Sequence, residues 1–115
     1  MPFDQVAQAL SVYETVENPR DTEYRLFAQV TNALINHRDR QGKDTIEAID
    51  WNRRLWLTLQ SDVSSEANAL SDDLRANVIS LAIWVDRHSR AVMRGEASME
   101  PLIQVNRTVM EGLAQ

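Results

Sequence analysis

Few residues in this sequence of 115 could do chemistry, and the clearest candidates are two histidines, His37 and His88. A helical metal-binding pair needs a second His or a carboxylate four residues away, and neither histidine has one. His88 is explained by its place near the end of a predicted helix, where a cation is favoured. The chain has no cysteine, which excludes thiolate nucleophiles, disulfides and Cys-ligated zinc.

The neighbouring carboxylates Asp72 and Asp73 are the other candidates, as acid–base or metal-binding groups. They follow Ser71 at the start of a predicted helix, where negative charge complements the helix dipole. The sequence contains no Gly-rich phosphate loop, no G-x-S-x-G motif and no Ser/His/Asp spacing that suggests a triad. We therefore predict that the protein is not an enzyme and has no catalytic residue, no cofactor and no metal site.

Three tryptophans favour binding over catalysis, because tryptophan is enriched in interface hot spots. Trp56 and Trp84 lie on apolar stripes of predicted helices, so core packing is the first expectation for both. Trp51 lies between Asp50 and Asn52, off the main stripe of its helix. Two alternatives stay open for Trp51: it closes over the bundle, or it is an exposed anchor for a partner.

Two arginines, Arg53 and Arg54, precede Trp56 on the same predicted helix. A solvated face with ion pairs is the first expectation, for example Asp50 with Arg54 four residues on. The alternative is that the two guanidinium groups contact a carboxylate or a phosphate on a partner.

The composition is that of one globular domain, which we place at residues 1–115. Hydrophobic residues make up 43% and charged residues 25% of the chain. The formal net charge of −5 repels phosphate backbones and anionic lipid surfaces. No signal peptide is visible at the N-terminus, and the longest apolar stretch, residues 81–85, is too short to cross a bilayer. We expect a cytoplasmic protein that binds no membrane.

Glycine and proline number only three each, and no segment alternates polar and apolar residues over a useful length. The pattern predicts an all-α fold, a small helical bundle of about four main helices plus a short N-terminal helix. The short helix carries an apolar stripe, formed by Phe3, Val6, Leu10 and Tyr13. Such a terminal helix either completes the core or detaches, exposing a groove that can receive a partner's amphipathic helix.

Capping residues predict where the first two main helices begin and end. The first begins at Pro19 and ends near Arg40, with Gly42 able to take the left-handed conformation that follows a helix. The second has Asp44 as its N-cap and Glu47 completing a capping box, and it runs to residue 61 or 62.

The third main helix is predicted over residues 72–94, between a Ser71 cap and Gly95. Because this helix is apolar on most of its sides, we expect it to be central, with neighbours on more than one face. The last main helix begins within residues 98–101, with Pro101 in its first turn, and runs to about Leu113.

Three stretches carry a resemblance to a known family: residues 53–56 (RRLW), residues 73–85 (DLRANVISLAIWV) and residues 102–113 (LIQVNRTVMEGL). Their order, their spacing and the chain length resemble the FlaF family of flagellar biosynthesis regulatory proteins of alphaproteobacteria. The likeness covers residues 3–113 and rests on the combination of the three stretches, since none is a chemical signature. It implies a single FlaF-like helical domain.

The resemblance implies a non-enzymatic role in flagellum biogenesis. FlaF-like proteins promote the production or export of flagellin and act opposite FlbT, a repressor of flagellin translation. The implied function is to bind the amphipathic terminal helices of flagellin as a chaperone and export factor, and to promote flagellin synthesis. The alternative is a post-transcriptional regulator that acts on flagellin mRNA directly or through FlbT.

Flagellin is therefore the expected partner, followed by FlbT. RNA ranks below both, because acidic neighbours offset the basic residues that RNA would need, which are Arg38, Arg40, Lys43, Arg53 and Arg54. A homodimer through Trp84 or the heptad-spaced stripe of its helix is a further hypothesis. The candidate partner-binding residues are Phe3, Val6, Leu10, Tyr13, Trp51, Arg53, Arg54 and Trp84.

Overall fold

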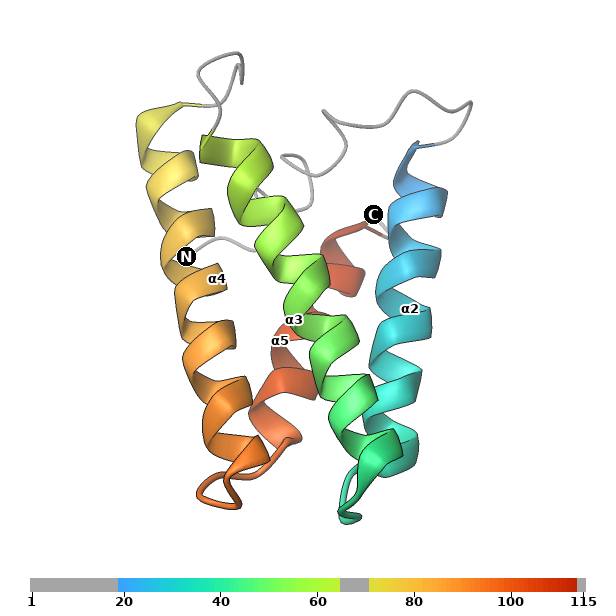
Figure 1. The fold of residues 1–115 in the computed structure, drawn as a ribbon. Coiled ribbons are helices and arrows are strands. Elements are labelled where there is room, and N and C mark those ends of the chain that lie inside the picture. The colour runs from blue at the N-terminus through green and yellow to red at the C-terminus, as the bar shows by residue number, and fades with distance from the viewer. Residues whose placement is uncertain (1–18, 65–70, 114–115) are drawn as a thin grey trace.

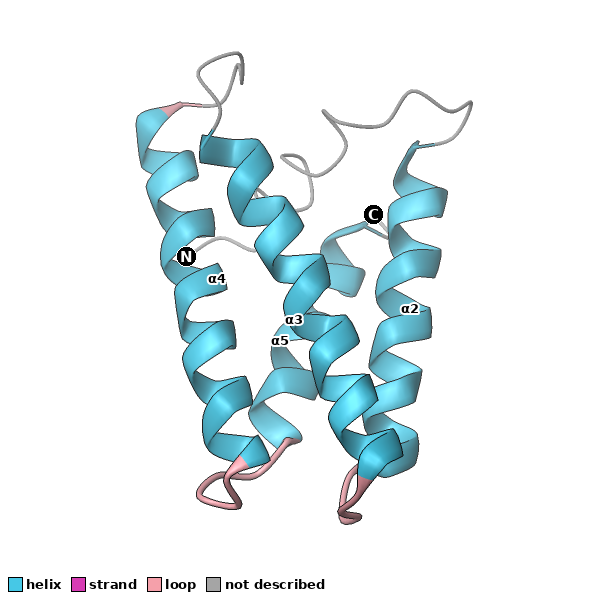
Figure 2. Ribbon diagram, viewed as in Figure 1, coloured by secondary structure: helices cyan, strands magenta, loops and turns pink. Residues whose placement is uncertain are grey.

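A computed structural model describes residues 19–64 and 71–113, which form four helices and no strand (Figures 1 and 2). The helices are α2 (Pro19–His37), α3 (Lys43–Ser64), α4 (Asp72–Met93) and α5 (Glu100–Leu113). The predicted all-α bundle is thus confirmed. The predicted N-terminal helix with Phe3, Val6, Leu10 and Tyr13 lies outside the described residues.

The helices pack in a ring in which one of the four contacts is thin. Helix α3 packs against α2 on one side and α4 on the other, and α2 also packs against α5. Helix α5 runs behind α3, from the lower end of α4 toward α2 (Figure 1). Contact between α4 and α5 is slight. Helix α4 has two neighbouring helices among the described residues, as predicted for residues 72–94, but it packs mainly on α3, so the prediction that it is the central helix is wrong in part.

The connection between α2 and α3 differs from the sequence prediction in two ways. Helix α2 ends at His37 rather than near Arg40, and Asp39 (φ 74°) takes the left-handed conformation predicted for Gly42. Gly42 instead accepts the first bond of α3, since its carbonyl receives the Ile46 N–H at 3.1 Å. Asp44 therefore lies in the first turn of α3, where it complements the helix dipole, and is not the N-cap.

Helix α4 ends in a Schellman motif around Gly95. The Gly95 N–H donates to the Val92 carbonyl at 3.0 Å, and the Glu96 N–H donates to the Ala91 carbonyl at 2.9 Å. Gly95 has φ 76°, a conformation that a side chain disfavours. The tight turn sends the chain into α5, whose first turn accommodates Pro101 because the missing N–H needs no helical partner there.

The core lies between the four helices and centres on Trp56, which is 1% exposed. Phe27 of α2 meets its ring edge to face, with centroids 5.8 Å apart and planes at 80°. The predicted core position of Trp56 is confirmed. Other fully buried side chains come from all four helices: Leu34, Ile49, Val63, Val78, Val85, Leu102, Ile103 and Val109.

Two asparagines lie inside this core and tie α3 to α5. The Trp56 Nε1–H donates to Asn106 Oδ1 at 3.0 Å, and Asn106 Nδ2 donates to Asn52 Oδ1 at 2.7 Å. Both asparagines are at most 1% exposed. These bonds satisfy polar groups that would otherwise be costly to bury, and they fix the register of α5 against α3. None of the described helices is both long and apolar enough to span a membrane.

Candidate partner-binding surfaces

Trp51 lies on the outer edge between α2 and α3, where it lines an open groove of about 590 Å³. It is 36% exposed, so it neither belongs to the core nor projects freely into solvent. The groove is a candidate binding surface because its lining combines Trp51 and two alanines with charged side chains. The groove is lined by Ala33, His37, Asp44, Glu47, Ala48, Trp51 and Arg54.

Arg54 and Arg53, neighbours in sequence, belong to different surfaces. Arg54 lines the Trp51 groove, and its Nε lies 3.5 Å from the Asp50 backbone carbonyl. Arg53 points the other way, where its Nε and Nη2 donate to Asp86 Oδ1 of α4 at 3.0 and 2.9 Å. The expected ion pair of Asp50 is also made with Arg53, at 2.9 Å, instead of Arg54.

Arg53 therefore acts as a clamp between α3 and α4. Its side chain is 20% exposed and that of Asp86 is 23% exposed. Hydrogen bonding to Asp86 raises the pKa of the Arg53 guanidinium above its ordinary value, with the charges of Asp86 and Asp50 acting in the same direction. Arg90 donates to the other oxygen of Asp86 at 3.1 Å. With its donors committed to carboxylates of its own chain, Arg53 is a poor candidate for contacting a partner.

Trp84 packs against the core but is only half-buried, so its predicted core position is correct in part. Its ring stacks on that of His88, with centroids 5.0 Å apart. His88 Nε2 lies 2.7 Å from the Ser98 carbonyl, in the segment that leads into α5. The N–H at this nitrogen donates, which fixes the ring at the junction of α4 and α5. Trp84 thus lies on the side of α4 that faces α5.

The flank of α5 that faces α4 follows from its other contacts. Arg38, in the turn that follows α2, pairs with Glu100 at 3.6 Å, which places the end of α2 on the Glu100 and Ile103 side of α5. The opposite flank carries Pro101, Val105 and Thr108, which are four and three residues apart. We call the line between the two helices the α4–α5 seam. It is formed by Leu81, Trp84 and His88 of α4 and by Pro101, Val105 and Thr108 of α5, all of intermediate burial.

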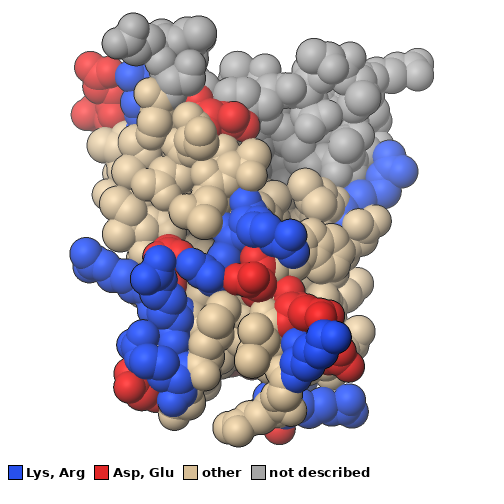
Figure 3. All heavy atoms as spheres, in the orientation of Figure 1, with Lys and Arg blue, Asp and Glu red and all other residues tan. Residues whose placement is uncertain are grey.

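A second apolar area crosses α3 and α4 above the Arg53–Asp86 pair. Leu57 follows Arg53 by one turn, and Ile83 precedes Asp86 by about one turn on the antiparallel helix, so the two lie side by side. They are 43% and 39% exposed. Figure 3 shows an uncharged area over the upper part of α3 and α4. Sequence reasoning missed Leu57, although its position two residues from Leu55 and Leu59, which face inward, marks it as outward-facing.

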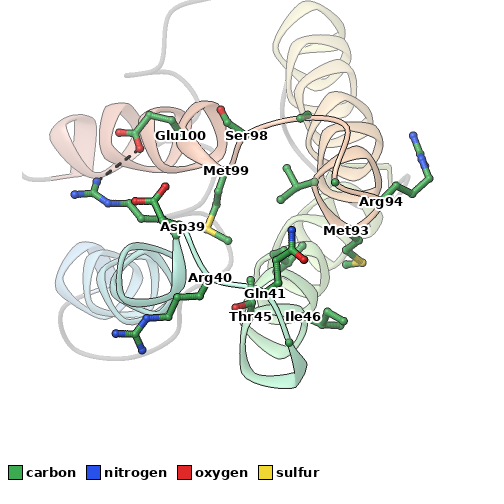
Figure 4. Close-up of a pocket in the computed structure, with 16 residues that line it drawn as sticks. Asp39, Arg40, Gln41, Thr45, Ile46, Met93, Arg94, Ser98, Met99 and Glu100 are labelled. Carbon is green, nitrogen blue, oxygen red and sulfur yellow. Dashed lines mark ion pairs between the residues drawn. The ribbon is translucent and has the colours of Figure 1, made fainter.

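A cavity of about 480 Å³ opens at the end of the bundle, between the α2–α3 and α4–α5 connections. Figure 4 shows Met99 pointing toward its centre, with Ile46 and Met93 on one side and the Arg38–Glu100 ion pair on the other. Arg40 and Arg94 line the cavity but point away from it. No sequence pattern indicates this cavity, since it forms between two turns that are distant in the chain.

The basic residues that RNA binding would need do not form one patch. Three of the five have acidic partners: Arg38 pairs with Glu100, Lys43 with Glu47, and Arg53 with both Asp50 and Asp86. Figure 3 shows charges of both signs interleaved on the lower half of the molecule. This distribution weakens the attraction to a phosphate backbone that a basic surface would exert.

Fold and surface together define a class of protein: a small helical bundle with half-open apolar surfaces on its outside. No group of three or more His, Asp or Glu side chains that could hold a metal ion occurs within residues 19–64 and 71–113. A family model described as flagellar protein FlaF matches residues 7–113. The chain belongs to the FlaF family. No curated protein and no solved structure matches it.

Proposed function

We propose that this flagellar protein is a non-enzymatic, cytoplasmic regulator that binds flagellin as a chaperone and export factor and promotes flagellin synthesis. Its membership of the FlaF family supports a flagellar role. The observation that carries the binding role is the Trp51 groove, in which a partly exposed tryptophan lies between two helices. Tryptophans in such positions are frequent anchors of protein interfaces.

Physical complementarity supports flagellin as the partner. The terminal helices of flagellin are amphipathic, and before polymerisation their apolar faces need cover from water. A groove between two helices accepts such a helix along its length, with apolar anchors at intervals of three and four residues. The lining of the Trp51 groove carries both signs of charge, Asp44 and Glu47 against Arg54, and can therefore pair with the polar edges of a helix.

Co-elution and calorimetry with purified flagellin test the proposal. Full-length flagellin is expected to form a stoichiometric complex, and flagellin without its terminal helices is expected to lose it. A failure of full-length flagellin to bind would reject direct chaperoning. Parallel titrations with FlbT and with flagellin mRNA test the alternative function. A steeply salt-dependent affinity for RNA alone would support regulation through flagellin mRNA.

A further inference from the structure

We propose that the cavity at the end of the bundle binds a small uncharged molecule that has an aliphatic part and one hydrogen-bonding group. The walls of this cavity come from residues 38–49 and 92–100 and share no residue with the Trp51 groove, so the proposal does not rest on flagellin binding. Its volume of about 480 Å³ lies within the usual range of small-molecule sites, roughly 300–1,000 Å³. One side chain of a protein partner would fill only part of that space.

The cavity offers an apolar wall that the protein itself does not cover. Ile49 and Met99 line it and are 1% and 7% exposed. Ile46, which also lines it, is 49% exposed, more than any other large hydrophobic side chain in the described part of the chain. Met93 and Met99 are unbranched and adapt to the shape of an apolar guest (Figure 4). An aliphatic group in the cavity would therefore shield Ile46 from water.

The hydroxyl of Thr45 supplies the polar contact. Thr45 lines the cavity, is 7% exposed, and makes no hydrogen bond to any residue within 19–64 and 71–113. The helical hydroxyls of Ser64, Ser89 and Thr108 instead bond to the carbonyl four residues earlier. Unlike the hydroxyl of Thr31, that of Thr45 is not enclosed by protein, so a molecule in the cavity can reach it. Such a molecule would satisfy an almost buried hydroxyl as donor or acceptor.

The charges around the cavity favour an uncharged ligand, because they nearly balance. The charged residues of the lining are three arginines and two carboxylates: Arg38, Arg40, Arg94, Asp39 and Glu100. Arg38 is paired with Glu100, and Arg40 and Arg94 point away from the cavity (Figure 4). Helices α2 and α4 end here, whereas α3 and α5 begin here, so their dipoles also offset one another (Figure 1).

Methionine methyl groups provide a readout confined to this site. Met93 and Met99 line the cavity, and Met110 lies about three turns further along α5 and does not. The full chain, labelled with carbon-13 in its methionine methyl groups, is titrated by NMR with hexanamide, hexanoate and hexylammonium. These three probes have the same chain length and differ in the charge of the head group.

We expect hexanamide to shift the Met93 and Met99 resonances in a saturable way, to leave Met110 unchanged, and to bind at least about threefold more tightly than either charged probe. No saturable shift of Met93 and Met99 would overturn the proposal. An equal shift of Met110 would overturn it too, because it would indicate unspecific partitioning. Tighter binding of hexanoate or hexylammonium would overturn the assignment to an uncharged ligand.

Two variants test the proposed contacts. Thr45→Val keeps the branched shape, loses the hydroxyl, and should weaken hexanamide binding by about fivefold. Ile46→Gln removes apolar wall and should weaken it by a similar factor, whereas the matched control Leu57→Gln, at a 43% exposed position of the same helix outside the cavity, should not. Unchanged affinity in both cavity variants would overturn the proposal, provided that circular dichroism shows all variants folded. Loss of flagellin binding leaves these outcomes unchanged, so the two proposals fail separately.

Discussion

Trp56 and Asn106 are fifty positions apart in sequence and share a buried hydrogen bond of 3.0 Å. The bond joins α3 to α5, and Asn106 extends it to Asn52 at 2.7 Å. A polar chain of this kind is stabilising only while every link is present, because each broken link leaves a buried group without a partner.

Asn106→Ala should lower the free energy of unfolding by about 2–4 kcal/mol, because it leaves the Trp56 N–H unsatisfied and opens a cavity. Asn52→Ala should cost roughly 1 kcal/mol less, since the Trp56–Asn106 bond survives and the unpartnered Asn52 Nδ2 is removed with the side chain. Urea unfolding followed by circular dichroism measures both. Equal losses of stability in the two variants would contradict the prediction that Asn106 contributes more than Asn52.

Thr31→Val is expected to raise stability by up to about 1 kcal/mol. The Thr31 hydroxyl is buried, at 2% residue exposure, and has no hydrogen-bond partner within residues 19–64 and 71–113. Valine has nearly the same shape and removes the cost of burying that hydroxyl. Thermal unfolding should therefore give a higher Tm for the variant. A lower Tm would mean that the hydroxyl finds a partner in solution, such as a bound water.

The Arg53–Asp86 pair should show a coupling energy of about 1–2 kcal/mol in a double-mutant cycle to alanine. The comparison pair is Lys43–Glu47, which is 87% and 63% exposed and should couple by about 0.3 kcal/mol. The raised pKa of Arg53 means that its contribution is present below the ordinary arginine pKa and is lost only at higher pH. Because the Arg53 guanidinium stays charged, the coupling energy of the pair should be the same at about pH 7 and about pH 9.

Trp51→Ala should weaken flagellin binding by about tenfold or more, while costing about 1 kcal/mol or less of stability because the side chain is already partly exposed. Leu57→Ala is the comparison variant, since Leu57 is 43% exposed on the same helix but lies toward α4. Its flagellin affinity should stay within about twofold of the natural protein. The reverse result would move the binding surface to the Leu57–Ile83 area.

Asp39→Gly and Gly95→Ala should change stability in opposite directions. Asp39 has φ 74° and Gly95 has φ 76°, so both lie in the left-handed region where a side chain is disfavoured. Replacing Asp39 by glycine relieves this strain and should stabilise the protein by up to about 1 kcal/mol, less the entropy that glycine adds to the unfolded chain. Gly95→Ala should destabilise it by about 1 kcal/mol. Chemical denaturation of the two variants side by side tests the pair.

Much of the fold was predictable because it depends on local patterns. The ends of α4 follow from Ser71 and Gly95, which cap a helix wherever the rest of the chain lies. The turn before α3 was less predictable, since Asp39 occupies the left-handed conformation that Gly42 would adopt at lower cost. Caps indicate where a helix can end, and packing between α2 and α3 decides where it does.

Predicting the binding surfaces was harder, because it depends on which helices become neighbours. The apolar run of α4 suggested a central helix, but its slight contact with α5 leaves Trp84 at a half-open seam. Likewise, nothing in the sequence distinguishes Arg53, which pairs with Asp86, from Arg54, which lines the Trp51 groove. Consecutive residues of a helix point about 100° apart, which is enough to place Arg53 in a structural ion pair and Arg54 on a candidate binding surface.

The neighbouring positions of α2 and α5 also bear on how the molecule is made. A ribosome makes α2 well before α5, yet the two helices pack against each other in the folded bundle. The ring of helices that buries Phe27 and Leu34 can close only after Leu102 and Ile103 have been synthesised. During translation the nascent chain therefore exposes an unfinished apolar surface until α5 has been synthesised.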